Sequence, residues 1–204
     1  MNPYGRSAQE QREYERLRYP DDHVLRNKLD CRIQEELDEA ERLIVAARLK
    51  DNLPASARRF DVAGLKAIHR HLFQDIYDWA GEFRRYTTGR SHVPFPPPEF
   101  LDSALDGLFR ELRSENHLTD LDRGAFAVRA AHYVNEINTA HPFVEGNGRT
   151  QRVWLRQLAE QAGYSLVLAE REKAEWYQAS AYGFHKGDEP MAELIARALA
   201  PLSR

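Results

Sequence analysis

The spacing of apolar residues predicts helices over most of this chain. In five stretches an apolar residue returns every three or four positions, with charged residues between. This period places the apolar side chains on one face of an amphipathic helix. The five stretches are 33–47, 65–79, 101–112, 126–137 and 149–162, and two shorter helices are expected over about 171–183 and 189–200.

Capping residues indicate where some of these helices begin and end. Asp61 is a good N-cap for the second helix, and Gly81 is expected to end it. Gly163 is expected to end the helix that begins near Arg149. The pattern as a whole predicts an all-α protein.

Two segments interrupt the helical pattern. Residues 84–100 (RRYTTGRSHVPFPPPEF) contain β-branched residues, a glycine and prolines at 94, 96, 97 and 98. Because proline lacks an N–H group and clashes with the preceding turn, this segment cannot continue a helix. We expect it to form a short β-hairpin flap. The second interruption is 141–149 (HPFVEGNGR), between two strongly predicted helices.

The domain organisation is expected to be simple. The sequence shows no internal repeat and no linker of low complexity, and its 204 residues fit one domain. We therefore expect a single domain over 1–204, with N-terminal helices in 1–83, the flap in about 84–100, core helices in 101–164 and C-terminal helices in 165–204.

Composition narrows the class of protein. The net charge is −3 and the pI is about 6.3, so no basic field favours nucleic acid. With Cys31 as its one cysteine, the chain forms no internal disulfide and no cysteine metal cluster. There is no signal-peptide pattern and no apolar run near the ~18 residues of a membrane span. We expect a cytoplasmic protein without direct nucleic-acid or membrane contact.

The backbone of HPFVEGNGRTQR, residues 141–152, suits an anion. Pro142 forces the preceding helix to end near His141. Gly146 and Gly148 flank Asn147, tolerate positive φ and let a ligand approach the main chain. Successive amides in such a turn form an anion nest, and the next helix directs its N-terminal N–H groups to the same place.

The side chains of this segment add the chemistry of phosphoryl-group transfer. Arg149 and Arg152 share one helix face, and guanidinium groups match phosphate oxygens. Glu145 beside a polyphosphate requires a cation, and Mg²⁺ binds through one or two carboxylates plus phosphates. His141 titrates near neutral pH and is a suitable general base for a hydroxyl group. The residues therefore predict transfer from a nucleoside triphosphate to a hydroxyl.

The same segment resembles the signature of Fic-domain proteins (the Fic/Doc family), HPFx(D/E)GNGRxxR, at every fixed position. Residues 68–84 (IHRHLFQDIYDWAGEFR) and 158–164 (LAEQAGY) also resemble this family. The similarity extends over roughly 15–200. It implies a single Fic-type helical domain with a flap, and the activity of a protein adenylyltransferase.

The resemblance also implies roles for individual residues. His141 would deprotonate the target hydroxyl, and Glu145 would hold Mg²⁺ against the α- and β-phosphates of ATP. The anion hole and the phosphate contacts would come from five residues: Gly146, Asn147, Gly148, Arg149 and Arg152. The target would pair with the flap as an added strand, at Arg90, Ser91, His92, Val93, Pro94 and Phe95. Tyr177 and Gln178 lie where this family often lines the adenosine pocket.

One regulatory feature of the family is missing. Many Fic proteins carry an inhibitory (S/T)xxxE(G/N) sequence whose glutamate pairs with the arginine equivalent to Arg152. Here Ser7 is followed four positions later by Gln11, and Ser165 by Ala169. This is similar to the small toxin branch, in which a separate antitoxin supplies the glutamate. Some members of that branch modify bacterial type II topoisomerases, which makes such an enzyme the expected target class.

Other functions remain open on the sequence alone. One is transfer of a different phosphate-linked group, and another is an ATP-binding module with a purely regulatory role. A DNA-binding regulator is disfavoured by the acidic pI. The remaining helical histidines, His69, His71 and His132, are expected to be structural.

Overall fold

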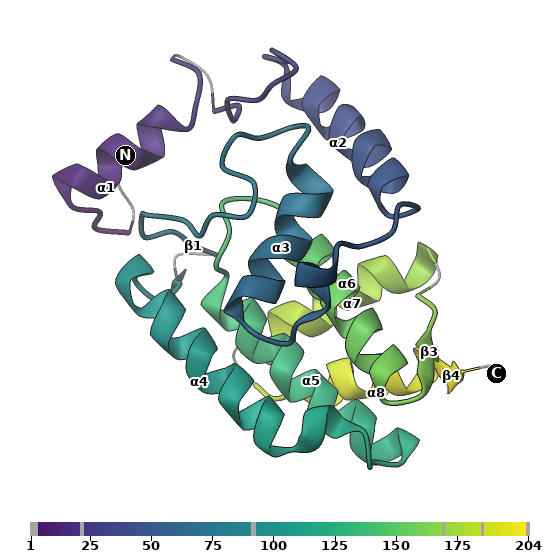
Figure 1. Cartoon of the computed structure of the whole chain (residues 1–204). Coiled ribbons are helices and arrows are strands. Elements are labelled where there is room, and N and C mark those ends of the chain that lie inside the picture. Colours follow the sequence, from purple (N-terminus) through teal and green to yellow (C-terminus); the bar gives the residue numbers. More distant parts are fainter. Residues whose placement is uncertain (1–3, 21–22, 91–92, 169, 185, 203–204) are drawn as a thin grey trace. The chain divides into compact units, whose positions relative to one another are not determined.

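The computed structural model describes residues 4–20, 23–90, 93–168, 170–184 and 186–202, and Figure 1 follows the chain between its ends. These residues fall into two compact units. The first comprises the described residues of Met1–Arg59, Ala63–Asp102 and Pro142–Asn147, and the second those of Phe60–Val62, Ser103–His141 and Gly148–Arg204. The expectation of one domain over 1–204 stays a prediction.

The first unit is built on α1 (Ala8–Arg16), α2 (Gln34–Arg48) and most of α3 (Val62–Phe73), with a short 3-10 helix, η1 (Ala55–Arg58), before α3. A capping box begins α1. The Ser7 hydroxyl accepts a hydrogen bond from the Glu10 N–H at 3.3 Å, and the Glu10 carboxylate accepts one from the Ser7 N–H at 2.9 Å.

Helix α3 is shorter than the apolar pattern predicts. It ends at Phe73 rather than near Gly81, and the chain continues in tighter turns, in which the Ile76 N–H bonds the Phe73 carbonyl three residues earlier at 2.9 Å. Ile76 is nevertheless buried, so the apolar spacing persists through turns that are not helical. Gly81 does end this segment, with a φ of 88°.

The expected hairpin is present at the described residues of the flap. Strands β1 (Gly89–Arg90) and β2 (Val93–Pro94) pair antiparallel, with Gly89 opposite Pro94 and Arg90 opposite Val93. The Phe95 N–H extends the pairing by a hydrogen bond of 2.8 Å to the Thr88 carbonyl. A 3-10 helix, η2 (Pro98–Phe100), then leads into the next helix.

The second unit has α5 at its centre. Helix α5 (Arg123–Ala140) buries most of its circumference, leaving one face with Val128 and Glu136 exposed, and packs against α8 (Glu189–Ala198) and α7 (Glu170–Gly183). Helix α4 (Leu101–Ser114) runs beside α5 (Figure 1), where Arg129 pairs with Glu111 at 2.9 Å. The remaining elements are η3 (Asn116–Leu118), α6 (Asn147–Gln161), β3 (Tyr164–Leu166) and β4 (Leu199–Pro201).

The expectation of an all-α fold with a short hairpin is confirmed, with one addition. Strands β3 and β4 pair antiparallel, with Leu166 opposite Leu199, so the last helix ends at Ala198 rather than at about 200. The sequence did not predict this pair. Each strand has only three residues, too few to display a two-residue period of burial.

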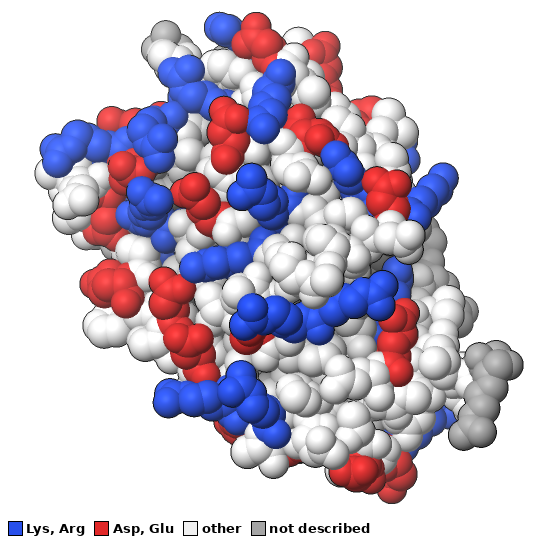
Figure 2. All heavy atoms as spheres, in the orientation of Figure 1, with Lys and Arg blue, Asp and Glu red and all other residues white. Residues whose placement is uncertain are grey.

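The surface carries charges of both signs. Figure 2 shows basic and acidic side chains interspersed on the face in view, in keeping with the net charge of −3. Within the described part of the chain, no helix combines the length and the apolar character of a membrane span.

Candidate functional site

The site expected from the sequence lies on the turn between α5 and α6. Helix α5 ends at Ala140, and His141 adopts the left-handed conformation with a φ of 43°. Its N–H still bonds the Ile137 carbonyl at 3.1 Å, and Pro142 follows. Positive φ is uncommon for residues other than glycine, so His141 is held in a special conformation at the helix end.

Position 146 requires glycine for two reasons, its backbone conformation and the lack of room for a side chain. Its φ is 80°, and a Cβ at this position would lie 2.3 Å from Cζ of Phe73. No side chain fits there unless the Phe73 ring moves. The turn therefore packs its main chain directly on the end of α3, within the first unit.

Asn147 fixes the turn with its side chain. The Asn147 amide nitrogen donates to the Phe143 carbonyl, and its oxygen accepts from the Phe143 N–H, both at 2.9 Å. This reciprocal pair is buried and uses both ends of the amide group. The side chain of Asn147 thereby holds the turn in shape, and the main-chain N–H of Asn147 is the donor that the expected anion hole takes from this residue.

Glu145 is exposed at the tip of this turn, and its Oε1 accepts a hydrogen bond from the Gly146 N–H at 2.8 Å. The Gly146 N–H, which we predict to bind a phosphate as part of the anion nest, is thus already bonded to a carboxylate oxygen. The described residues hold no cluster of three or more His, Cys, Asp or Glu side chains that could bind a metal. A Mg²⁺ ion held by one carboxylate and by substrate phosphates fits these residues, because it needs no protein cage.

His69 of α3 supports the turn from beneath. Its Nδ1 accepts a hydrogen bond from the Gly81 N–H at 2.8 Å, so Nε2 carries the proton and donates to the Glu145 carbonyl at 3.0 Å. The fully buried imidazole also stacks on Phe143, with ring centroids 3.9 Å apart. The sequence predicts a structural role for His69 but does not predict its contact with the turn. Residues 68–84, which resemble the Fic family and include His69, are the one sequence feature that could have indicated this contact.

The first turns of α6 are basic. Arg149, Arg152 and Arg156 follow at helical spacing. Burial lowers the pKa of Arg152 from its usual value, and the positive charges of Arg149 and Arg156 lower it further. The Arg152 guanidinium lies 5.9 Å from the centre of the Trp176 ring of α7. A cation that is partly buried among other cations is a favourable place for a polyphosphate.

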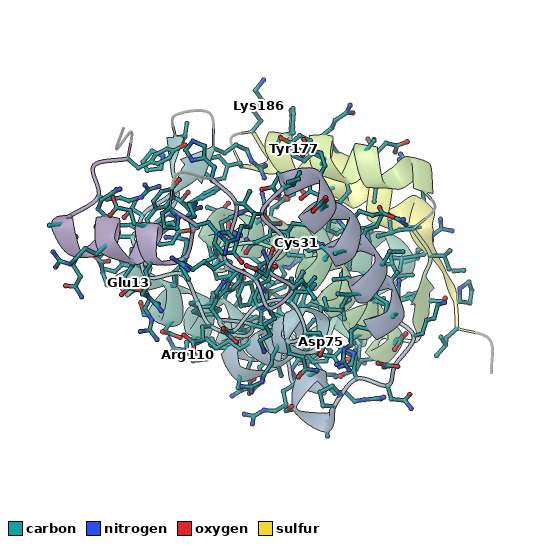
Figure 3. The ribbon with its side chains drawn as sticks, turned by 90° about the horizontal axis from the view of Figure 1, so that it is seen from above. Glu13, Cys31, Asp75, Arg110, Tyr177 and Lys186 are labelled. Atoms are coloured by element: carbon teal, nitrogen blue, oxygen red, sulfur yellow. The ribbon has the colours of Figure 1, made fainter. Side chains whose placement is uncertain are left out.

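The flap residues expected to meet a target differ in exposure. Pro94 is exposed, Arg90 and Val93 are half-buried, and Phe95 is buried and anchors the hairpin. Ser91 and His92 lie outside the described residues. The adenosine-pocket residues, Tyr177 and Gln178, are both exposed on α7, with Tyr177 at 62% (Figure 3).

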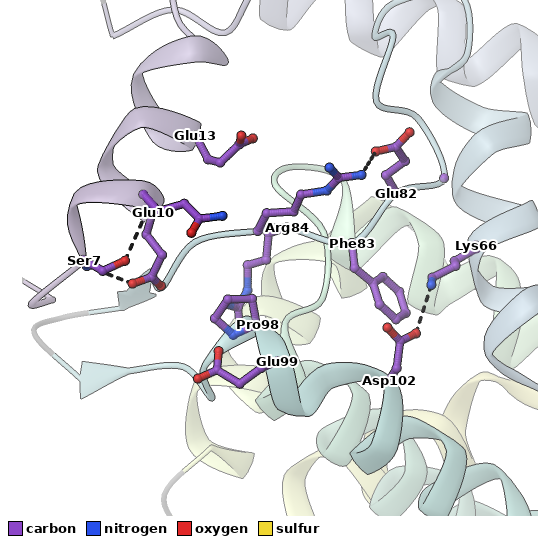
Figure 4. Close-up of a pocket in the computed structure, with 13 residues that line it drawn as sticks. Ser7, Glu10, Glu13, Lys66, Glu82, Phe83, Arg84, Pro98, Glu99 and Asp102 are labelled. Carbon is purple, nitrogen blue, oxygen red and sulfur yellow. Dashed lines mark hydrogen bonds and ion pairs between the residues drawn. The ribbon is translucent and has the colours of Figure 1, made fainter.

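A groove of about 910 Å³ opens in the first unit beside the flap (Figure 4). Many of its charges neutralise one another: Lys66 bonds Asp102 at 3.0 Å, and Arg85 bonds Glu82 at 3.1 Å. Its described lining includes none of the residues in 141–152. This groove is therefore separate from the predicted phosphate site.

The other helical histidines have contacts away from the turn. Nε2 of His71 lies 2.9 Å from the Arg48 carbonyl, and His132 lies between Glu111 and Asp188 at 3.9 and 3.6 Å. These contacts agree with the structural roles predicted for them.

Comparison with known proteins gives one consistent family. Residues 59–159 match the sequence model of the Fic/DOC family. The chain is 41% identical over 182 residues to the probable protein adenylyltransferase y4lH of Sinorhizobium fredii, covering 89% of this chain and 94% of that protein. It is 36% identical to the probable protein adenylyltransferase Fic of Escherichia coli K12, covering 81% and 82%.

Solved structures agree with the sequence relatives. The N-terminal Fic domain of a VirB-translocated Bep effector protein from Bartonella quintana, solved with bound ADP, superposes with a TM-score of 0.79 at 27% identity. The alignment covers 92% of this chain and 96% of that one.

Proposed function

Because this chain belongs to the Fic/DOC family, we propose that it is a protein adenylyltransferase, which transfers AMP from ATP to a hydroxyl side chain of a target protein. The observation that carries the proposal is the intact HPFVEGNGRTQR segment in a turn that leads from His141 into the arginine-bearing α6.

His141 is the proposed catalytic base. The target's hydroxyl oxygen bonds to the α-phosphorus of ATP, the bond from that phosphorus to the bridging α–β oxygen breaks, and pyrophosphate leaves. The imidazole of His141 takes the hydroxyl proton. Its left-handed conformation at the end of α5, with a φ of 43°, sets the direction of this side chain.

The phosphates are bound by main chain and by arginine in this proposal. The N–H groups of Gly146, Asn147 and Gly148 would bind the anion, which requires Glu145 to release the Gly146 N–H that it now accepts from. Arg149 and Arg152 would bind the phosphates beyond the bond that breaks, with Arg152 on the γ-phosphate. Glu145 would hold Mg²⁺ against the α- and β-phosphates, and the ion would supply positive charge that neutralises the leaving pyrophosphate.

The target is proposed to add a strand to the flap. Arg90, Val93 and Pro94 are the described flap residues to which an extended segment would pair, while the buried Phe95 anchors the hairpin. In strand addition the affinity comes mainly from main-chain hydrogen bonds, which do not depend on the side chains of the bound segment.

Regulation is proposed to come from a second protein. The chain lacks the (S/T)xxxE(G/N) sequence, and the charges that shift the pKa of Arg152 are those of Arg149 and Arg156, both cationic. A small cytoplasmic antitoxin that supplies a glutamate to Arg152 would complement this cluster. A bacterial type II topoisomerase is the target class proposed for such a toxin.

Label transfer from ATP tests the proposed chemistry. The chain is incubated with Mg²⁺, bacterial lysate and ATP labelled at either the α- or the γ-phosphate, alongside His141→Ala. We expect protein bands labelled from the α-phosphate alone and absent with His141→Ala, which should still bind ATP. Label from the γ-phosphate would contradict AMP transfer. ATP binding without any label would favour a regulatory ATP-binding module.

Growth on expression tests the toxin proposal separately. Expression of this chain alone in bacteria should arrest growth, and expression of His141→Ala should not. Equal growth of the two strains, at equal protein levels, would reject a toxin role while leaving the transferase proposal intact.

A further inference from the structure

Arg84 is a buried cation at the base of the flap. It follows the turn that ends at Gly81, and only 2% of its surface is exposed. Burial lowers its pKa to about 10, so the guanidinium remains charged at neutral pH. A buried charge is costly unless its hydrogen bonds are satisfied, so the partners of this side chain indicate its purpose.

Two of those partners are carbonyls on opposite sides of the hairpin. Nη1 of Arg84 donates to the Tyr86 carbonyl at 3.0 Å, and Nη2 donates to the Pro96 carbonyl at 2.6 Å. Tyr86 and Pro96 lie directly before and directly after the described hairpin residues, 87–90 and 93–95. One side chain therefore bonds residues on both sides of the segment that the proposed function assigns to target binding. Figure 4 shows Arg84 among the residues that line the groove beside the flap.

The sequence explains why a side chain is needed here. The second half of the flap, VPFPPP at 93–98, has prolines at 94, 96, 97 and 98. Since proline has no N–H group, only Val93 and Phe95 can donate from this half. The Phe95 N–H bonds the Thr88 carbonyl, but the prolines that follow have no N–H group to continue the pairing. The guanidinium of Arg84 supplies N–H donors in place of these missing backbone donors.

The main chain of Arg84 connects the flap with the predicted catalytic turn. Its N–H donates to the Pro142 carbonyl at 2.8 Å, and Pro142 begins the segment that carries Glu145 and Gly146. These contacts all lie within the first unit. Arg84 thus holds both ends of the hairpin by its side chain and the turn by its backbone.

A second contact holds the hairpin at Thr87, next to Tyr86. The Glu10 carboxylate of α1 accepts hydrogen bonds from the Thr87 N–H at 2.7 Å and from the Thr87 hydroxyl at 2.6 Å. Arg6 donates to the Thr87 carbonyl at 2.7 Å. The first strand is thereby also held by α1, and the side chain of Arg84 bonds a carbonyl on each side of the flap.

We infer that Arg84 is a positioning residue that sets the flap for the target protein, so that an added strand is presented in one register to the turn at 142–147. The role inferred for Arg84 is to position the hairpin, not to bind ATP or to take part in the chemical step. This inference rests on the proposed function, because strand addition by the target is part of that proposal.

Arg84→Met tests the inference, because it keeps the length and the apolar stem of the side chain and removes the donors. The matched control is Arg85→Met, which removes an exposed neighbouring arginine paired with Glu82. Three quantities are measured on the full chain: ATP affinity by calorimetry, hydrogen exchange of the Phe95 amide, and label transfer from α-labelled ATP at several lysate concentrations.

We expect ATP affinity within about twofold of wild type, while the Phe95 amide exchanges at least about tenfold faster. Transfer at low lysate concentration should fall at least about tenfold and recover in part as the lysate is concentrated, which marks weakened target binding. Arg85→Met should match wild type in all three measurements.

Several outcomes would overturn the inference. Unchanged exchange of Phe95 would show that Arg84 does not hold the hairpin, and an equal loss of ATP affinity and transfer would show a merely structural role. If Arg84→Met does not fold, Arg84→Lys is used, because one ammonium group cannot reproduce the planar guanidinium fork that bonds both carbonyls. If wild type labels no protein, the proposed function fails, and the exchange measurement still decides whether Arg84 holds the flap.

Discussion

Nε2 of His69 donates a hydrogen bond of 3.0 Å to the carbonyl oxygen of Glu145, the residue proposed to hold Mg²⁺. The direction of this bond follows from the other ring nitrogen, which accepts from the Gly81 N–H at 2.8 Å. One imidazole therefore joins the turn that ends the α3 segment with the turn proposed to bind the phosphates.

Replacing His69 by phenylalanine keeps the ring that stacks on Phe143 and removes both hydrogen bonds. Each buried group left without a partner costs about 1–3 kcal/mol, so the free energy of unfolding should fall. Affinity for Mg-ATP should fall as well, because Glu145 and Gly146 lose their support. Thermal unfolding and calorimetry measure the two effects. His71→Phe on the same helix is the control, and it should lose stability with ATP affinity unchanged. Equal ATP affinity in both variants would contradict the support role.

Gly146→Ala should damage both stability and ATP binding. The new methyl group would lie 2.3 Å from Phe73 and would occupy a φ of 80°. The strain of positive φ costs roughly 1–2 kcal/mol, and the overlap with Phe73 adds about 1–3 kcal/mol. Gly163→Ala is a matched control, since its φ is 85° and no atom lies within 4 Å of the added carbon. Equal losses of stability in the two variants, measured by denaturant unfolding, would show that Phe73 simply moves aside.

Arg152→Gln should remove the preference for ATP over ADP if Arg152 holds the γ-phosphate. A hydrogen bond to a charged group contributes about 1.5–3 kcal/mol, which corresponds to roughly 10- to 100-fold in affinity. Calorimetric titration with ATP and with ADP measures the difference directly. Arg156→Gln, one turn later and exposed on α6, should bind both nucleotides as wild type does. A uniform loss for ATP and ADP in Arg152→Gln would assign the arginine to an inner phosphate.

The contact of α1 with the flap should depend on pH. Hydrogen bonds, chiefly from the Thr87 hydroxyl, lower the pKa of Glu10 from 4.5 to about 2. Since the folded-state pKa is depressed, the stabilisation is complete above about 4.5 and is lost as the pH falls from there towards 2. Thermal unfolding of wild type and Glu10→Gln should differ at pH 6 and converge with acidification. Glu13→Gln, which removes a carboxylate of the same helix that pairs with Arg16 and leaves the contact with Thr87 in place, is the control.

The second predicted helix shows what an apolar sequence pattern does and does not predict. Leu65, Ile68 and Leu72 are buried as their spacing indicates, and so is Ile76 beyond the helix end. The pattern therefore identifies which residues enter the core, but it does not distinguish a continued helix from compact turns. The segment beyond Phe73 also makes a contact that apolar spacing does not reveal, the bond from the Gly81 N–H to Nδ1 of His69.

The sequence by itself determined the family, the helical class and the residues of the predicted site, because these depend on local constraints. Pro142 ends α5 through its own covalent geometry, whatever packs around it. The spacing of the glycines and arginines in 141–152 is likewise a property of the sequence and indicates the predicted site without the fold. Only the tertiary structure decided that His69 holds Glu145, that Arg84 joins Tyr86 to Pro96, and that β3 meets β4. The contacts of His69 and of β3 with β4 join residues far apart along the chain. The bonds of Arg84 require a buried guanidinium whose partners become apparent only when the main chain has folded around it.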